Sequence, residues 1–303
     1  MIKHFLALIL SLSVGYSAFA CDACACTSMN TLDGQLLPSN KTFFGTSLGF
    51  AHQLDASKSK ISNLSYNVFV AYSFAKRFQI MGNLPFQHTI TNYKNGDRKA
   101  QLGLGDATLL FSVMAYSTPK DKEKPSKSTL IFRVGAKFPT GYYDNTGSDF
   151  NLGTKSYDVL LSSQYIFEKN KQGFNASFNS RINTTNKYNY KYGHQFNFST
   201  FYFIKREFKK NSYMPFAGVN YEYITKDKSN GYLRNLTGGT GVYGFGGLQW
   251  NYNDKFSFYL KGELPFTQNY LSTEGEIYTN FRGQLQINYF IKTKQKIKKS
   301  FKL

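Results

Sequence analysis

Two stretches between Gly103 and Gly141 alternate apolar and polar side chains residue by residue. A period of two residues is typical of β-strands, because successive side chains point to opposite faces. Each stretch is about 11 residues long, which is enough for a tilted strand to cross a bilayer. The apolar face is predicted to comprise Ala107, Leu109, Phe111, Val113 and Ala115, then Leu130, Phe132, Val134, Ala136 and Phe138. The opposite face is predicted to comprise Thr108, Leu110, Ser112, Met114 and Tyr116, then Arg133, Gly135 and Lys137. One face for lipid and one for water predicts a transmembrane β-barrel.

The same alternation continues to the end of the chain and predicts about 12 antiparallel strands in an up-and-down barrel. An even number of strands brings the chain back to its starting side, the periplasm. Prolines 85, 139 and 265 are expected at strand ends, because proline cannot donate to a ladder. The strands are expected near 42–53, 63–75, 78–89, 103–117, 128–139, 157–168, 173–184, 194–206, 213–225, 240–252, 255–267 and 277–291.

The two ends of the chain differ from the predicted barrel. Residues 1–20 have a short apolar core followed by Ala18-Phe19-Ala20, which is typical of a cleaved secretory signal peptide. Residues 21–40 are predicted to form a periplasmic segment that contains the cysteines, and residues 41–291 the barrel. Residues 292–303 form a basic tail.

The composition fits a barrel and restricts the partners. The chain has 29 Phe and 23 Tyr, as in the aromatic girdles of outer-membrane barrels, although an AT-rich genome would also favour these residues. The mean hydropathy is −0.40, so the membrane prediction rests on alternation alone. The net charge is +19, but the basic residues are scattered instead of forming a stripe, so a nucleic-acid partner is not predicted.

All three cysteines of the chain, Cys21, Cys24 and Cys26, lie within six residues. Thiolates are ligands for soft metals such as copper or zinc. In an oxidising envelope, two of the three could instead form a disulfide, and Cys21 could carry an acyl anchor. Apart from a soft metal at this cluster, no cofactor is expected.

Several short motifs occur in an order that resembles the outer-membrane barrel family labelled "putative MetA-pathway of phenol degradation". Its usual L-G-T-G-S-x-D run has glycine where this chain has Lys155. The resemblance implies a barrel that passes small, apolar or aromatic molecules. The matching motifs are Gly103-Leu104-Gly105-Asp106, Lys137-Phe138-Pro139-Thr140-Gly141, Leu152-Gly153-Thr154-Lys155-Ser156-Tyr157-Asp158, Asn175-Ala176-Ser177 with Arg181, and Tyr192-Gly193-His194.

Seven charged side chains fall on the inward face of the predicted strands. They are candidates for a pore lining that sets selectivity, or for ion pairs that fill the lumen. They are Arg133, Lys137, Arg181, Glu222, Lys261, Glu263 and Arg282.

We therefore predict a non-enzymatic channel or transporter for small solutes in the bacterial outer membrane, with both termini periplasmic. One alternative is a non-conducting binding or sensing barrel whose cysteines engage a metal or a partner. A lipid hydrolase is a further alternative, but the sequence has no G-x-S-x-G elbow, and no serine accompanies His52, His88 or His194 on a strand face. Membrane lipid and a small solute are the expected partners, and the sequence leaves the oligomeric state open.

Overall fold

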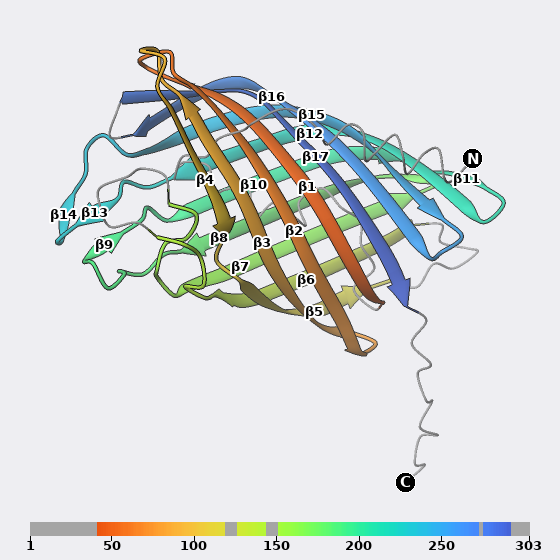
Figure 1. Ribbon diagram of the computed structural model, residues 1–303. Helices are drawn as coiled ribbons and strands as arrows, with labels where there is room; N and C mark the ends of the chain where they lie inside the picture. The colour runs from red at the N-terminus through yellow and green to blue at the C-terminus, as the bar shows by residue number, and fades with distance from the viewer. Residues whose placement is uncertain (1–40, 119–125, 144–150, 273–274, 292–303) are drawn as a thin grey trace, which may run out of the picture.

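A computed structural model describes residues 41–118, 126–143, 151–272 and 275–291 (Figure 1). The predicted signal peptide, the cysteine-containing segment and the basic tail lie outside these residues. Among the described residues, no helix has the length and hydropathy of a membrane span.

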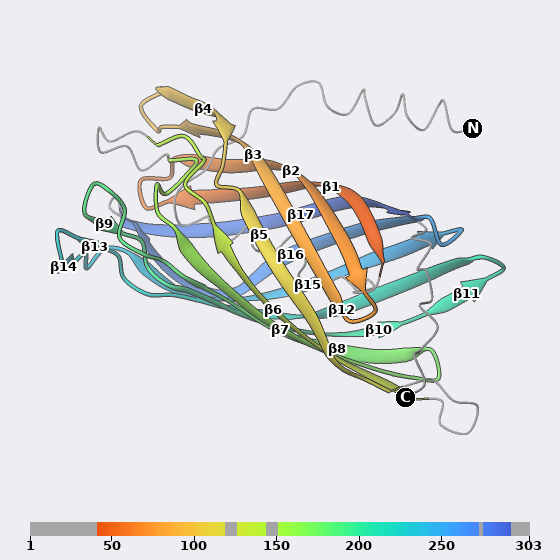
Figure 2. The same cartoon turned by 90° about the horizontal axis from the view of Figure 1, so that it is seen from below.

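The described chain is almost entirely β-structure, arranged as a tilted barrel (Figures 1 and 2). The strands are β1 (Thr42–Asp55), β2 (Lys60–Ala75), β3 (Phe78–Asn92), β4 (Arg98–Leu104), β5 (Thr108–Ser117), β6 (Ser126–Lys137), β7 (Asp158–Lys169), β8 (Gln172–Ile182), β9 (Tyr190–Lys191), β10 (Gln195–Ile204), β11 (Arg206–Phe208), β12 (Asn211–Ile224), β13 (Lys228–Ser229), β14 (Tyr232–Leu233), β15 (Gly238–Tyr252), β16 (Phe256–Ser272) and β17 (Gly275–Ile291).

The sheet closes on itself, because β1 pairs with β17 and β10 pairs with β12. Each neighbouring pair in the barrel is antiparallel. Two pairs of consecutive elements, β4 with β5 and β10 with β11, are each one barrel strand with a short break, so the barrel has 12 strands. This confirms the predicted fold class and the positions of the predicted strands.

The two ends of the barrel carry different connections. At the end where Thr42 pairs with Ile291, here called the terminal end, turns such as 76–77 and 170–171 are short. The opposite end, here called the loop end, carries longer connections such as 183–194 and 225–237. Parts of these form a small sheet of β9, β13 and β14, which Figure 1 shows at the loop end, opposite β11.

The faces of the strands are as the alternation predicts along most of the barrel. On β2, Tyr66, Val70 and Tyr72 are exposed on the outside, while Asn63 and Asn67, at odd-numbered positions of the same strand, are buried inside. Strands of a water-soluble β-sandwich place apolar side chains inside and polar side chains outside. This strand has the opposite arrangement, which fits a lipid environment.

Two details of the predicted strands are wrong. Tyr116 was expected inside, but it is half exposed on the outer face, because a bulge at Ala115 shifts the register after Met114. Pro85 and Pro265 lie inside β3 and β16 and not at strand ends. The partner of β3 changes from β5 to β4 beside Pro85, and Pro265 lies where the β16 ladder is interrupted, so neither position needs a backbone N–H.

Aromatic rings form a belt on the outer face near the terminal end. Trp250 stacks between Tyr213 and Phe258, with ring centroids 5.9 and 5.1 Å apart. Phe256 continues the row to Tyr289 at 5.1 Å. Such rings favour the boundary between acyl chains and headgroups, so this belt marks one membrane interface.

Trp250 is the single tryptophan of the chain, so its fluorescence reports the position of this belt. In vesicles of brominated lipids, we expect bromine near the headgroup to quench Trp250 more than bromine near the bilayer centre. The Trp250→Phe variant gives the background signal. Stronger quenching by the deep bromine would contradict the interfacial position.

Candidate functional site

Four charged side chains from neighbouring strands form a buried ionic cluster on the inner wall. Arg282 on β17 donates to both carboxylate oxygens of Glu222 on β12, at 2.6 and 3.1 Å. Glu263 on β16 lies 3.7 Å from the same guanidinium and pairs with Lys261. All four are at least nine-tenths buried. We call Glu222, Lys261, Glu263 and Arg282 the ionic cluster.

Aromatic rings hold the ionic cluster in place. The Tyr270 hydroxyl donates to Glu222 at 2.9 Å, and the Arg282 guanidinium donates to the Tyr243 hydroxyl at 3.0 Å. The guanidinium also lies 4.1 Å from the Tyr243 ring centroid, and the Lys261 ammonium lies 4.5 Å from that of Phe245. Each charge therefore has several partners, as buried charges require.

The same two tyrosines belong to an apolar group near the loop end. This group, here called the upper apolar cluster, is buried inside the barrel beside the ionic cluster. Together the two clusters fill part of the lumen with a charged layer and an apolar layer. The members of the upper apolar cluster are Ile61, Ile90, Ile224, Tyr243, Tyr270 and Ile277.

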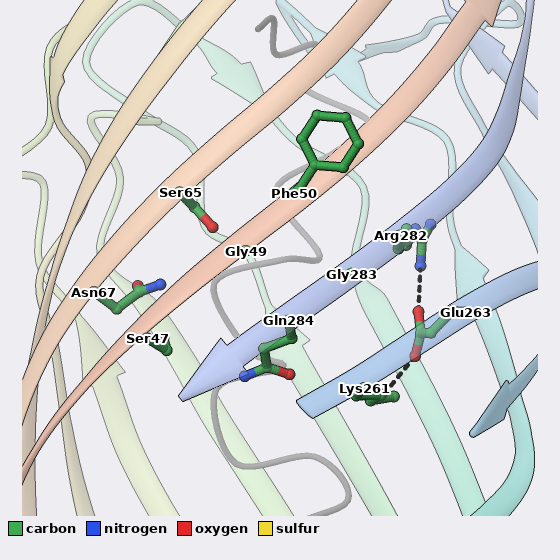
Figure 3. A pocket seen from close by; sticks show the side chains of 10 residues that line it. All are labelled: Ser47, Gly49, Phe50, Ser65, Asn67, Lys261, Glu263, Arg282, Gly283 and Gln284. Carbon is green, nitrogen blue, oxygen red and sulfur yellow. Dashed lines mark ion pairs between the residues drawn. The ribbon is translucent and has the colours of Figure 1, made fainter. Parts of the chain in front are cut away.

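A small polar cavity borders the ionic cluster (Figure 3). Figure 3 shows Lys261, Glu263 and Arg282 joined by ion pairs along one side of it, and Ser65 and Asn67 of β2 also line it. Its volume of about 40 Å³ is enough for a water molecule but not for an organic solute. This cavity next to the ionic cluster is therefore too small for an organic molecule.

Lys137 forms a second buried network at the end of β6. Its ammonium lies 2.8 Å from Asp106 and 2.6 Å from Asp158, and it also contacts Thr154. Asp106 lies in the break between β4 and β5, and Asp158 begins β7. Ser156 donates to Asp158 at 2.9 Å. We call these residues the Lys137 network.

The Lys137 network connects the long connection after β6 to the barrel wall. The backbone N–H groups of Gly141 and Thr154 donate to Asp106 at 2.9 and 2.8 Å. Gly141 and Gly153 approach so closely that a Cβ on Gly153 would lie 2.7 Å from Gly141 Cα and from Asp106 Oδ1. Both positions therefore need glycine.

Sequence reasoning missed Asp106 and Asp158 as site residues. Both stand in the motifs that carry the family resemblance, as do Lys137, Thr154 and Gly141, and the structure brings these motifs together. The sequence did contain a signal for this site, because the motifs shared with the family include two carboxylates and a lysine.

Lys155 stands where the family motif usually has glycine. The backbone conformation at this position explains why glycine is usual there. Its φ is +53°, in the left-handed region that costs residues with a Cβ about 1–2 kcal/mol. We predict that Lys155→Gly raises the free energy of unfolding by about 1 kcal/mol, less than the full cost because glycine also loosens the unfolded chain. Urea unfolding in detergent micelles measures this, with Lys155→Ala as the control that keeps the Cβ. A less stable glycine variant would contradict the explanation.

The remaining two predicted charges lie on β6 and β8. Arg133 is half-buried and donates to Gln164 at 2.8 Å and to Ser162 at 3.5 Å. Arg181 is buried on the inner face of β8 and lies opposite Gln195 of β10. All seven residues thus occupy inward positions, and a pore-lining role for them remains a prediction.

A larger cavity opens at the terminal end of the lumen. Its volume is about 410 Å³, within the range of sites for small organic molecules. We call it the terminal-end cavity. It is lined by Lys41, Met114, Ser117, Lys127, Thr129, Ile131, Ile166, Glu168, Phe203, Lys205, Ser212, Met214, Gln249, Asn251, Asp254, Phe256 and Phe290.

The histidines are placed without a serine partner in the described part of the chain. His194 Nδ1 accepts a hydrogen bond from the Asn183 backbone N–H at 3.1 Å. No hydrogen bond joins His52, His88 or His194 to a serine among residues 41–118, 126–143, 151–272 and 275–291.

The predicted metal ligands Cys21, Cys24 and Cys26 lie outside the described residues. Within those residues, no group of three or more His, Cys, Asp or Glu side chains is arranged to hold a metal ion.

Comparisons with solved structures support the barrel architecture. The crystal structure of the COG4313 outer membrane channel from Pseudomonas putida F1 is similar with a TM-score of 0.67 at 13% identity, covering 86% of this chain and 98% of that one. The β domain of the Bordetella autotransporter BrkA is similar with a TM-score of 0.50 at 8% identity, covering 83% and 100%. At these identities the likeness shows the fold. No curated protein gave a significant match.

A family model matches residues 89–281, which is more than half of the chain and contains the Lys137 network and three residues of the ionic cluster, Glu222, Lys261 and Glu263. The chain therefore belongs to the family described as "Putative MetA-pathway of phenol degradation".

Proposed function

We propose that this protein is a passive channel of the bacterial outer membrane for small solutes, with apolar or aromatic molecules as candidate cargo. The observation that carries this proposal is a closed barrel with lipid-compatible residues outside and an interior that holds buried polar and charged groups together with apolar clusters. The similar structure from Pseudomonas putida F1 is that of an outer membrane channel, and the family description points to aromatic compounds.

The orientation follows from the connections. Outer-membrane barrels have short periplasmic turns and longer external loops, so the terminal end and both chain termini face the periplasm in this proposal. Membrane lipid is then a partner of the outer face.

The lumen limits the size of the solute. The cavity beside the ionic cluster has a volume of about 40 Å³, and the upper apolar cluster lies towards the loop end. A solute passes only when these side chains move, so conductance should be small and bulky sugars should be excluded. The inward charges Arg133, Lys137, Arg181, Glu222, Lys261, Glu263 and Arg282 are the residues that would filter solutes by charge.

Swelling of liposomes that contain the refolded mature chain tests the proposal. Small amino acids, which cross lipid only slowly because they are zwitterions, should enter faster than disaccharides, and heat-unfolded protein should give no influx. Absence of influx for every solute, from a barrel whose gel mobility changes on heating, would overturn the channel function.

The small cavity and the buried side chains beside the ionic cluster favour a second candidate. It is a non-conducting barrel that binds a metal or a partner through Cys21, Cys24 and Cys26. Replacing all three cysteines by serine separates the two candidates. A channel should conduct as before, whereas a metal-binding barrel should lose binding of Cu(I) or Zn²⁺ measured by equilibrium dialysis.

A further inference from the structure

The terminal-end cavity combines an apolar wall with charged groups. Ile131, Phe203 and Phe290 are buried around it, and the two methionines Met114 and Met214 also line it. Aromatic rings and thioethers adapt to a planar ring at small cost, because methionine is flexible and polarisable. The volume of about 410 Å³ holds a molecule with one ring and a short substituent.

The charged groups of the cavity are mainly basic. Lys41, Lys127 and Lys205 line it together with two carboxylates, Glu168 and Asp254. Lys205 is already paired with Glu207 at 2.8 Å.

Two of these lysines have no carboxylate partner among the described residues. The Lys41 ammonium lies 5.3 Å from the centroid of the Phe290 ring, so a cation stands directly over the apolar wall. Within the part of the chain that the structure describes, no carboxylate forms an ion pair with Lys41 or Lys127. Two ammonium groups beside an apolar wall are complementary to a ring that carries a carboxylate.

We propose that the terminal-end cavity binds amphipathic organic anions, namely monocyclic carboxylates of the size of benzoate. The ring contacts Ile131, Phe203 and Phe290, and the carboxylate lies between the ammonium groups of Lys41 and Lys127. This inference rests on the proposed channel function and deepens it, because it names the class of solute that the periplasmic mouth selects.

Binding to the refolded full-length mature chain in neutral detergent tests the proposal without requiring conduction. Three probes share one ring and differ in charge: benzoate, benzyl alcohol and benzylammonium. Isothermal titration should show benzoate as the tightest of the three. Lys41→Gln with Lys127→Gln should weaken benzoate binding about two- to thirtyfold, because each partly exposed ion pair contributes about 0.2–1 kcal/mol. The same pair of substitutions should leave benzyl alcohol unchanged.

Matched controls separate the cavity from the general basic charge. Lys60→Gln with Lys94→Gln removes the same charge from exposed positions at the loop end and should leave benzoate affinity unchanged. All variants replace accessible lysines, and their folding is checked by heat-dependent gel mobility. Acetate, which lacks the ring, should bind more weakly than benzoate.

Each result decides the proposal. Equal affinity for the three ring probes, or tightest binding of benzylammonium through Glu168 and Asp254, would overturn it. Loss of benzoate affinity in the loop-end control would also overturn it. Benzoate binding without any liposome influx would keep the site and reject the channel, whereas influx without charge preference would keep the channel and reject the site.

Discussion

Replacing Arg282 by methionine is expected to lower the free energy of unfolding by about 3–5 kcal/mol, the cost of breaking a buried ion pair by removing one partner. Arg282 neutralises Glu222 through two hydrogen bonds and approaches Glu263. Without it, Glu222 keeps only neutral donors in the described structure, such as Tyr270 and Asn220. Methionine preserves much of the side-chain volume of arginine. The loss of stability therefore measures the effect of removing the charge.

Urea unfolding in detergent micelles, followed by Trp250 fluorescence, measures this loss. Lys205→Met is the matched control, because Lys205 pairs with the exposed Glu207 at the terminal rim. That pair should contribute less than about 1 kcal/mol. The comparison separates a buried ion pair from an exposed one within the same barrel.

A second substitution identifies the cause of the loss. Adding Glu222→Gln to Arg282→Met removes the unpaired carboxylate and should restore more than half of the lost stability. A loss below about 1 kcal/mol for Arg282→Met alone would show that water screens the ionic cluster. The lumen around the ionic cluster would then contain more water than the burial of these side chains indicates.

The barrel itself could be predicted from the sequence because one physical rule applies along every strand. Lipid accepts apolar side chains on one face only, so a slip of one residue would expose polar groups such as Asn63 or Asn67 to the hydrocarbon. The rule fails where the ladder is irregular. The bulge at Ala115 reverses the face of Tyr116. The ladder breaks beside Pro85 and Pro265 cannot be read from the alternation.

The candidate site could be predicted only in part. Inward charges follow from strand parity, which is why Glu222, Lys261 and Arg282 were found. The alternation of faces along a strand does not predict which charges form ion pairs. Pairing across β12, β15, β16 and β17 depends on how these four strands are staggered relative to one another. Asp106 lies in a strand break and contacts a connection that folds back onto the wall, so no strand pattern could assign its role.

Replacing Lys137 by methionine is expected to cost about 3–5 kcal/mol of stability for the same electrostatic reason. Its removal leaves Asp106 and Asp158 buried without their shared cation. Here the effect should also be local, because Asp106 accepts the backbone N–H groups of Gly141 and Thr154, which attach the connection after β6. Repulsion between the two carboxylates should release that connection before the barrel unfolds.

Hydrogen exchange measured by mass spectrometry distinguishes local release from global loss. In Lys137→Met, peptides that contain Gly141 and Thr154 should exchange faster, while peptides from β16 and β17 keep their protection. Arg282→Met should show the reverse distribution, because its partners lie on β12 and β16. Unchanged exchange at Gly141 and Thr154 would contradict an anchoring role for the Lys137 network.

Two further variants test whether charge is the cause. Lys127→Met makes the same substitution on the same strand, at an exposed residue without an ion pair in the described structure, and should leave both stability and exchange nearly unchanged. Adding Asp106→Asn and Asp158→Asn to Lys137→Met should restore the protection of Gly141 and Thr154 in part, since the amide side chains can still accept hydrogen bonds. If protection stays low in this neutral network, the packing of the Lys137 side chain, and not its charge, holds the connection to the wall.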